Sequence, residues 1–271
     1  MQLGVHLDFR IPDDVSRLTA AAREAGFTAI QFSPTGLEIN EHTIAAIQKA
    51  CAATGLEIVS AAGYANPLRP SDSSTGFTVG KELQLARALR RLGVHKLVVR
   101  SGTFGATLHD PDLRNGEAEA WQAAVGHVRA LEQICAGGGS ELLVEPHFAH
   151  VLSNVEACER FLGEIGGDRV KLVLDPPNLV APASFEKRET IVDDVLKKLA
   201  RRSGLVHFKD YRPRPDGSIE YLPAGQGVLD YKRFVTGIIR SGYEGPGIVE
   251  CAEPATMAAV RAFVEPLVAV I

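Results

Sequence analysis

The sequence predicts an α/β fold, a (β/α)8 or TIM barrel formed by residues 1–271 as a single domain. Short apolar segments alternate with longer segments of helical periodicity along the whole chain, and eight such cycles can be counted. Eight βα units of roughly 30 residues each would account for the full length of a barrel. No glycine-rich phosphate loop follows the first apolar segment, which reads His6-Leu7-Asp8, so an open dinucleotide-binding sheet is disfavoured.

Eight segments are expected to form the strands because each is a short run of apolar residues. Most of these runs are continuous rather than alternating, which is typical of parallel strands that are covered on both faces. The expected strands are residues 3–7, 29–32, 57–61, 96–99, 141–144, 171–174, 205–208 and 247–249.

The segments between the strands are expected to be amphipathic helices. Apolar residues recur three and four positions apart, as at Val15, Leu18 and Ala22 in the first interval. Several of these segments end in a glycine that can form a left-handed cap just before the next strand. These glycines are Gly26, Gly55, Gly93 and Gly242. The glycine triplet 137–139 is interpreted as a loop before the fifth strand rather than as a boundary between domains.

The longer loops are expected at one end of the barrel. Residues 64–74, 102–116, 176–184 and 211–227 all follow expected strands, whereas the connections from helix to strand are short. Loops that follow the strands of a barrel gather at its C-terminal face, where functional residues are usually found. We therefore look for a site at this face.

The composition argues against several classes of protein. The formal net charge is −4, and no basic stripe typical of a nucleic-acid-binding protein occurs. The four cysteines form no CxxC pair, which suits buried thiols in a reducing compartment. No signal-peptide pattern begins the chain, and no apolar stretch approaches the roughly 20 residues of a membrane span. We expect a cytoplasmic protein with no nucleic-acid or membrane partner; a homo-oligomer is compatible with the sequence.

Four consecutive strands end in a side chain that can bind a metal ion. Glu145, Asp175, His207 and Glu250 stand at the ends of the fifth to eighth expected strands. A single acidic residue after a strand is often a helix cap, but four in succession are harder to explain in that way. Three carboxylates buried together would also repel one another without a cation. Three oxygens and one imidazole nitrogen suit one divalent ion, Mn²⁺ first and otherwise Mg²⁺, Co²⁺ or Zn²⁺.

Other polar residues near these strand ends are candidates for contacts with a substrate. Arg100 is expected either to bind a substrate carboxylate or phosphate, or to pair with an acidic residue of a loop. His147 is expected at the rim of the site, and Lys209 either binds substrate or supports a metal ligand. Arg212 is a further candidate for substrate binding, although a solvated loop position is equally compatible with the sequence.

Two loop aromatics, Tyr64 and Phe104, either line the pocket or pack in the core. Asp230 follows the segment Gly225-Gln226-Gly227 and is expected to cap the next helix.

The order of these motifs resembles the sugar isomerase/epimerase superfamily of xylose-isomerase-like barrels. A glutamate is followed by Asp175-Pro-Pro-Asn178, then by His207-Phe-Lys-Asp210, and then by a late glutamate. The resemblance covers nearly the whole chain. It implies that Glu145, Asp175, His207 and Glu250 bind the metal and that Glu145 and Glu250 also serve as acid and base. Asn178 stands where several epimerases have a histidine that contacts substrate, and this departure disfavours a ketose 3-epimerase activity.

The resemblance implies a metal-dependent isomerase or epimerase that acts on a small sugar, keto sugar or keto acid through an enediolate. The superfamily also contains dehydratases, so a lyase acting on a keto sugar or an inosose-like substrate is the alternative. Nucleases of the endonuclease IV type belong to it as well. The fourth strand ends in Arg100-Ser101-Gly102, without the histidine ligand of those multi-metal enzymes, which favours one metal ion. A barrel that binds metal without turnover remains the other alternative.

Overall fold

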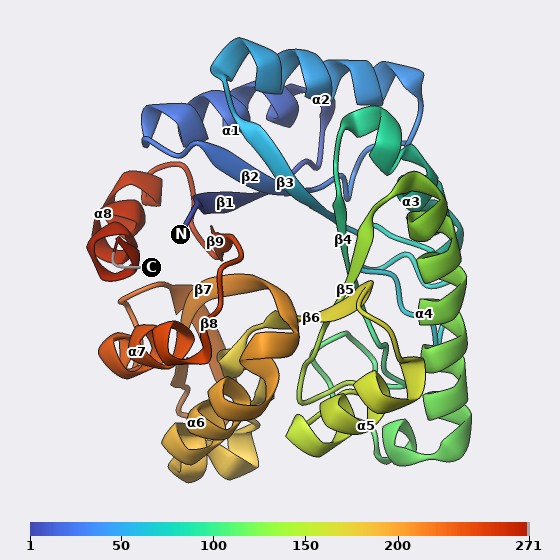
Figure 1. The fold of residues 1–271 in the computed structure, drawn as a ribbon, viewed down its shortest axis with the longest axis vertical. Helices are drawn as coiled ribbons and strands as arrows, with labels where there is room; N and C mark the ends of the chain where they lie inside the picture. Colours follow the sequence, from blue (N-terminus) through green and yellow to red (C-terminus); the bar gives the residue numbers. More distant parts are fainter. Residues whose placement is uncertain (270–271) are drawn as a thin grey trace.

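Eight parallel strands form a closed ring in the computed structural model, which describes residues 1–269 (Figure 1). The strands are β1 (Leu3–Asp8), β2 (Ala29–Ser33), β3 (Glu57–Ala62), β4 (Lys96–Arg100), β5 (Glu141–Glu145), β6 (Val170–Leu174), β7 (Ser203–Pro213) and β9 (Gly247–Val249). Each strand pairs with the next in sequence from β1 to β7, and β9 pairs with both β7 and β1, which closes the ring. The predicted (β/α)8 barrel is confirmed.

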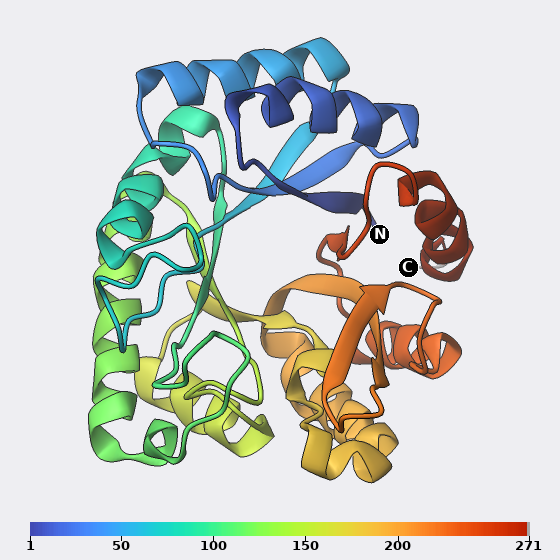
Figure 2. The same cartoon turned by 180° about the vertical axis from the view of Figure 1, so that it is seen from behind.

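Eight helices surround the strands, as Figure 2 shows from the opposite side of the molecule. They are α1 (Pro12–Glu24), α2 (Glu41–Thr54), α3 (Val79–Leu92), α4 (Ala118–Gly138), α5 (Val155–Ile165), α6 (Arg188–Leu199), α7 (Tyr231–Ser241) and α8 (Met257–Val268). Sequence neighbours pack against each other around the ring, and α1 also contacts α8. Within residues 1–269, no helix combines the length and the apolar character that crossing a bilayer requires.

Glycines end several helices where the sequence predicts caps. Gly55, Gly93 and Gly242 adopt left-handed backbone angles, with φ of 67°, 71° and 69°, directly after α2, α3 and α7. The prediction for residues 137–139 was wrong in part, because the first two of these glycines belong to α4 and only Gly139 forms the cap. Glycine disfavours a helix by about 1 kcal/mol per residue. The buried face of α4 offsets that cost.

The inside of the barrel is filled by a layer of apolar side chains from the strands. This layer consists of Ala29, Val59, Ala62, Val98, Leu143, Val173, Leu205 and Ile248. The alternate strand residues, such as Leu142 and Val144, belong to the larger core between strands and helices. Because side chains of a strand alternate between its two faces, the residue two positions after an inner-layer residue points inward as well. The exception is on β3, where the register is irregular and Ala61, two positions after Val59, belongs to the larger core. The sequence therefore places a second layer above the first.

A hairpin replaces the long loop that the sequence predicted for residues 211–227. β7 continues to Pro213 and pairs antiparallel with β8 (Ile219–Pro223). A turn containing Asp216 and Gly217 joins the two strands; Gly217 has a φ of 82°, and Asp216 accepts a hydrogen bond from the backbone of Ser218. An Asp-Gly pair is a recognised hairpin signal, so the sequence did contain the information.

Candidate functional site

The four predicted metal ligands converge at the C-terminal end of the barrel. Each stands two residues after an inner-layer residue, since Glu145 follows Leu143 and Asp175 follows Val173 in this way. His207 and Glu250 have the same relation to Leu205 and Ile248. One ligand atom from each of the four residues lies within 4.8 Å of the other three, and all four residues are buried.

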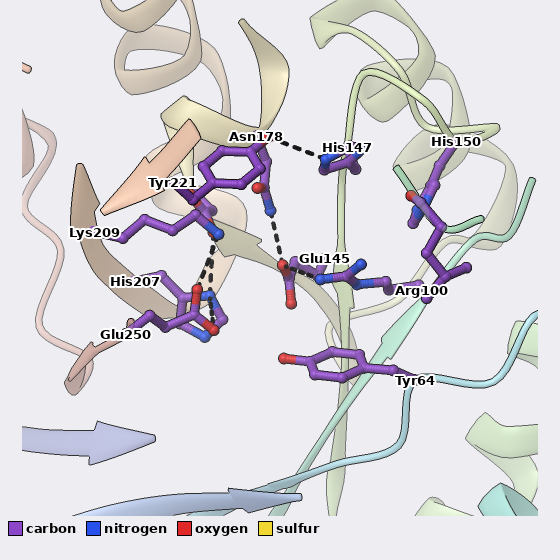
Figure 3. Close-up of polar contacts among 12 residues, drawn as sticks. Tyr64, Arg100, Glu145, His147, His150, Asn178, His207, Lys209, Tyr221 and Glu250 are labelled. Carbon is purple, nitrogen blue, oxygen red and sulfur yellow. Dashed lines mark hydrogen bonds and ion pairs between the residues drawn. The ribbon is translucent and has the colours of Figure 1, made fainter. Parts of the chain in front are cut away.

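Lys209 pairs with two of these carboxylates. Its Nζ lies 2.6 Å from Asp175 Oδ2 and 2.9 Å from Glu250 Oε2. His207 Nδ1 lies 3.2 Å and 3.3 Å from oxygens of the same two residues. His207 and Lys209 of β7 thus contact the residues that directly follow β6 and β9. Figure 3 shows the contact of Lys209 with Glu250.

Glu145 has a separate set of partners on the other side of the cluster. Asn178 Nδ2 donates a hydrogen bond of 2.7 Å to Glu145 Oε1, and an Arg100 guanidinium nitrogen lies 3.3 Å from the same oxygen. The Arg100 guanidinium also stacks over the ring of Tyr64, 4.5 Å from its centroid. Glu145 and Glu250 therefore belong to one cluster but pair with different positively charged side chains, Arg100 and Lys209.

The residues present fit a divalent metal ion. Two buried carboxylate oxygens, Glu145 Oε2 and Asp175 Oδ1, have no hydrogen-bond partner among the described residues. An unsatisfied buried carboxylate oxygen is costly, and a coordinated cation would remove that cost. Three carboxylates and an imidazole are also the donor set that Mn²⁺, Mg²⁺ or Zn²⁺ accepts. Glu145, Asp175, His207 and Glu250 could hold such an ion together.

Burial and neighbouring charges oppose each other in this cluster. Burial raises the pKa of Glu250, but His207 and Lys209 outweigh burial and lower it below its usual value. Burial also raises the pKa of Glu145, but the charges of Arg100, His207 and Lys209 together outweigh burial and lower it. Burial lowers the pKa of Lys209, yet the adjacent carboxylates raise it well above its usual value. Both glutamates are therefore ionised, as metal ligands must be.

A hydrogen-bonded pair of buried residues, Gln31 and Ser60, orients His207. Gln31 is fully buried, and its Oε1 lies 3.4 Å from His207 Nε2 and accepts a 2.9 Å hydrogen bond from Ser60. With Nε2 facing the amide oxygen, Nδ1 of His207 faces the cluster. A partner on the second ring nitrogen commonly fixes the tautomer of a metal-binding histidine.

The structure brings together most of the candidate substrate-binding residues. Arg100, Asn178 and Lys209 each contact a residue of the carboxylate cluster, and His147 lies at its rim (Figure 3). Arg212 is not among them. It lies on the exposed part of the hairpin, where its guanidinium pairs with Glu220 at 2.7 Å, because its side chain leaves the strand on the side opposite to Lys209.

Three residues that line this region were not predicted from the sequence. Tyr221 lies on β8, with its hydroxyl 3.0 Å from His147 Nε2. His109 packs against His147 with ring centroids 5.3 Å apart, and Gln31 contacts His207 of the cluster. Only Gln31 carried a usable signal, since it stands two residues after the inner-layer residue Ala29. Tyr221 and His109 lie on segments that follow β7 and β4, and the direction of these segments depends on the tertiary fold.

A groove of about 890 Å³ lies elsewhere, between α6 and α7. It is lined by side chains such as Lys197, Arg201 and Arg233, and none of its lining residues belongs to the carboxylate cluster or contacts it. The groove is therefore separate from the candidate site at the C-terminal face of the barrel.

The chain spans about half the length of a known protein to which it is similar in sequence. An inosose dehydratase from Geobacillus thermodenitrificans is 25% identical over 154 residues, which are 52% of this chain and 50% of that protein.

Solved structures share the fold over nearly the whole chain. The 3-keto-D-glucoside 4-epimerase YcjR from E. coli superposes with a TM-score of 0.71 at 19% identity, covering 98% of this chain and 99% of the other. A xylose isomerase-like TIM barrel protein from Mycobacterium smegmatis, solved in complex with magnesium, gives 0.70 at 17% identity, covering 95% and 89%. The family model described as xylose isomerase-like TIM barrel matches residues 19–266. The chain therefore belongs to the xylose isomerase-like TIM barrel family.

Proposed function

We propose that this protein is a divalent-metal-dependent isomerase or epimerase of a small sugar, keto sugar or keto acid. The observation that carries the proposal is the pair Glu145 and Glu250, which come from β5 and β9 into one buried cluster with different cationic partners. Two carboxylates in different surroundings can take different roles in proton transfer.

In this proposal the two glutamates exchange protons with the carbon next to the substrate carbonyl. One of them removes the proton, which leaves an enediolate, and the other returns a proton to carbon or moves one between the two oxygens. A divalent cation, proposed as Mn²⁺, would polarise the carbonyl and stabilise the negative charge that develops on its oxygen. Asp175 and His207 serve only to hold that ion.

The neighbouring polar residues position the substrate and the acid/base pair. Asn178 and Arg100 orient Glu145 through its Oε1, and Lys209 orients Glu250 through its Oε2. The residues proposed to contact the substrate directly are Arg100, His147, Asn178 and Lys209. Arg100 ends β4 and Lys209 lies within β7, whereas His147 and Asn178 lie in the connections that follow β5 and β6.

The test is exchange of substrate hydrogen with solvent. Wild-type protein loaded with Mn²⁺ is incubated in D2O with a panel of keto sugars and keto acids, and deuterium in recovered substrate and product is measured by mass spectrometry. Glu145→Gln and Glu250→Gln are each expected to slow turnover by about 10²- to 10⁴-fold. Metal content of each variant is measured in parallel, because both residues also belong to the metal cluster.

Glu141→Gln is the matched control. Glu141 is the first residue of β5, the same strand that ends in Glu145, but it pairs with Lys96 and Lys171 at the opposite end of the barrel. We expect this variant to keep wild-type turnover. A Glu250→Gln protein that binds metal and retains most of its turnover would overturn the acid/base assignment.

A lyase reaction is the second candidate, and the relative named inosose dehydratase favours it. The same enediolate can expel a hydroxyl from the next carbon instead of accepting a proton. Product analysis separates the two: isomerisation returns a sugar of unchanged composition that carries solvent deuterium, whereas elimination yields a product that has lost water.

A further inference from the structure

The hydrogen-bond directions around His147 determine what Tyr221 can do. The backbone N–H of Ala149 donates to His147 Nδ1 at 3.1 Å. A ring nitrogen that accepts a hydrogen bond carries no hydrogen, so the ring hydrogen of His147 is on Nε2. Nε2 lies 3.0 Å from the Tyr221 hydroxyl, and His147 therefore donates while the Tyr221 oxygen accepts.

The hydroxyl hydrogen of Tyr221 is consequently free to be donated elsewhere. Among residues 1–269, the Tyr221 hydroxyl makes no hydrogen bond other than the one with His147. Burial raises the pKa of Tyr221 well above its usual value, although Lys209 opposes the shift, so the phenol keeps its hydrogen. A partly buried donor without an acceptor calls for a ligand or a water molecule.

The ring of Tyr221 extends from the carboxylate cluster toward the rim. Lys209 Nζ lies 4.9 Å from the ring centroid, and that same nitrogen contacts Asp175 and Glu250. At the other end, the hydroxyl meets His147 on the loop after β5 (Figure 3). The free donor thus lies beyond the cluster, on the side of the rim residue His147.

We propose that Tyr221 is a specificity-determining residue that donates a hydrogen bond to a hydroxyl of the substrate, at the end that the carboxylate cluster does not hold. This inference rests on the proposed function, because it takes the substrate to be a polyhydroxylated molecule seated at that cluster. The β7–β8 hairpin then serves to carry this donor over the site. A hydroxyl-bearing ligand is favoured over an apolar one, which would leave the donor unpaired.

Tyr211 supplies a matched control on the same hairpin. It is paired directly opposite Tyr221 in the antiparallel register, and it is almost fully buried. Its ring packs against Phe185, with centroids 6.0 Å apart, and not against the carboxylate cluster. Tyr221→Phe and Tyr211→Phe therefore remove the same hydroxyl group from two adjacent positions of one structural element.

The experiment measures binding separately from turnover. A six-carbon alditol and its single-deoxy derivatives serve as probes, because they lack a carbonyl and cannot react. Their affinities for wild-type, Tyr221→Phe and Tyr211→Phe protein, each loaded with Mn²⁺, are measured by isothermal titration calorimetry. We expect Tyr221→Phe to bind the alditol about 3- to 10-fold more weakly, the effect of one hydrogen bond, and Tyr211→Phe to bind like wild type.

Selectivity distinguishes recognition from a structural effect. Wild-type protein should bind one deoxy derivative more weakly than the parent alditol by a similar factor, and Tyr221→Phe should bind these two ligands equally. Equal affinities of wild type and Tyr221→Phe, retained selectivity in Tyr221→Phe, or no alditol binding by wild type would overturn the inference. Failure of the proposed function would appear instead as absent deuterium exchange by wild type on every carbonyl substrate.

Discussion

Metal binding by this protein should weaken as the pH falls, and the reason lies in His207. Burial lowers the pKa of His207, but Glu250, Asp175 and Glu145 outweigh burial and raise it above 6.5 when no metal is bound. A protonated imidazole cannot be a ligand through Nδ1, so the ion must displace that proton. The perturbation we propose is a change of pH between 6 and 8 with Mn²⁺ as the ligand.

The sign and the size of the effect follow from linkage. Because the pKa of His207 is raised in the folded protein, its protonation stabilises the metal-free folded form. This contribution is complete below pH 6.5 and is lost as the pH rises through the pKa of His207 in the folded protein. Below that pKa, release of one proton on binding makes the apparent dissociation constant rise up to about tenfold for each pH unit lost, or roughly 1.4 kcal/mol. In a protein of this size, that corresponds to about 3–5 °C of metal-induced stabilisation per pH unit.

The assay is thermal unfolding with and without Mn²⁺ at several pH values, combined with calorimetry in buffers of different protonation enthalpy to count released protons. We expect a larger shift of the unfolding temperature at pH 8 than at pH 6. His207→Gln keeps an oxygen donor but removes the titrating group, so its affinity should be lower and nearly independent of pH. An affinity of the wild type that is constant from pH 6 to 8, or an equal slope in His207→Gln, would refute the reasoning.

Three further substitutions test the support of the site and of the barrel. Asn178→Leu removes the 2.7 Å hydrogen bond to Glu145, which should raise the pKa of that carboxylate. The acid limb of the pH–rate profile should then move to higher pH, and turnover should fall about 10-fold. An unchanged pH–rate profile would contradict this role of Asn178. Gly36→Ala should lower the free energy of unfolding by about 1–3 kcal/mol, because the new methyl group would overlap the main-chain oxygen of Arg10. Gly126→Ala, inside α4 with open space around it, should instead stabilise the protein by up to about 1 kcal/mol, and denaturant unfolding measures both changes.

The barrel and the residues that form the carboxylate cluster could both be predicted from the sequence alone. Strand positions followed from short apolar runs, and the strand ends placed a polar side chain in line with an inner-layer residue at Glu145, Asp175, His207 and Glu250. Both signals are local, since they depend on the two-residue period of a strand and on where that strand ends.

The contacts that these side chains make with other residues could be identified only from the tertiary structure. Lys209 pairs with Glu250 across 41 residues of sequence, and Tyr221 meets His147 across 74 residues. Such contacts depend on the register between strands and on the course of the loops and hairpins that follow the strands. Neither can be predicted from the local spacing of apolar residues. Arg212 illustrates the limit, because it lies only three residues after Lys209 yet points to the exposed side of the hairpin.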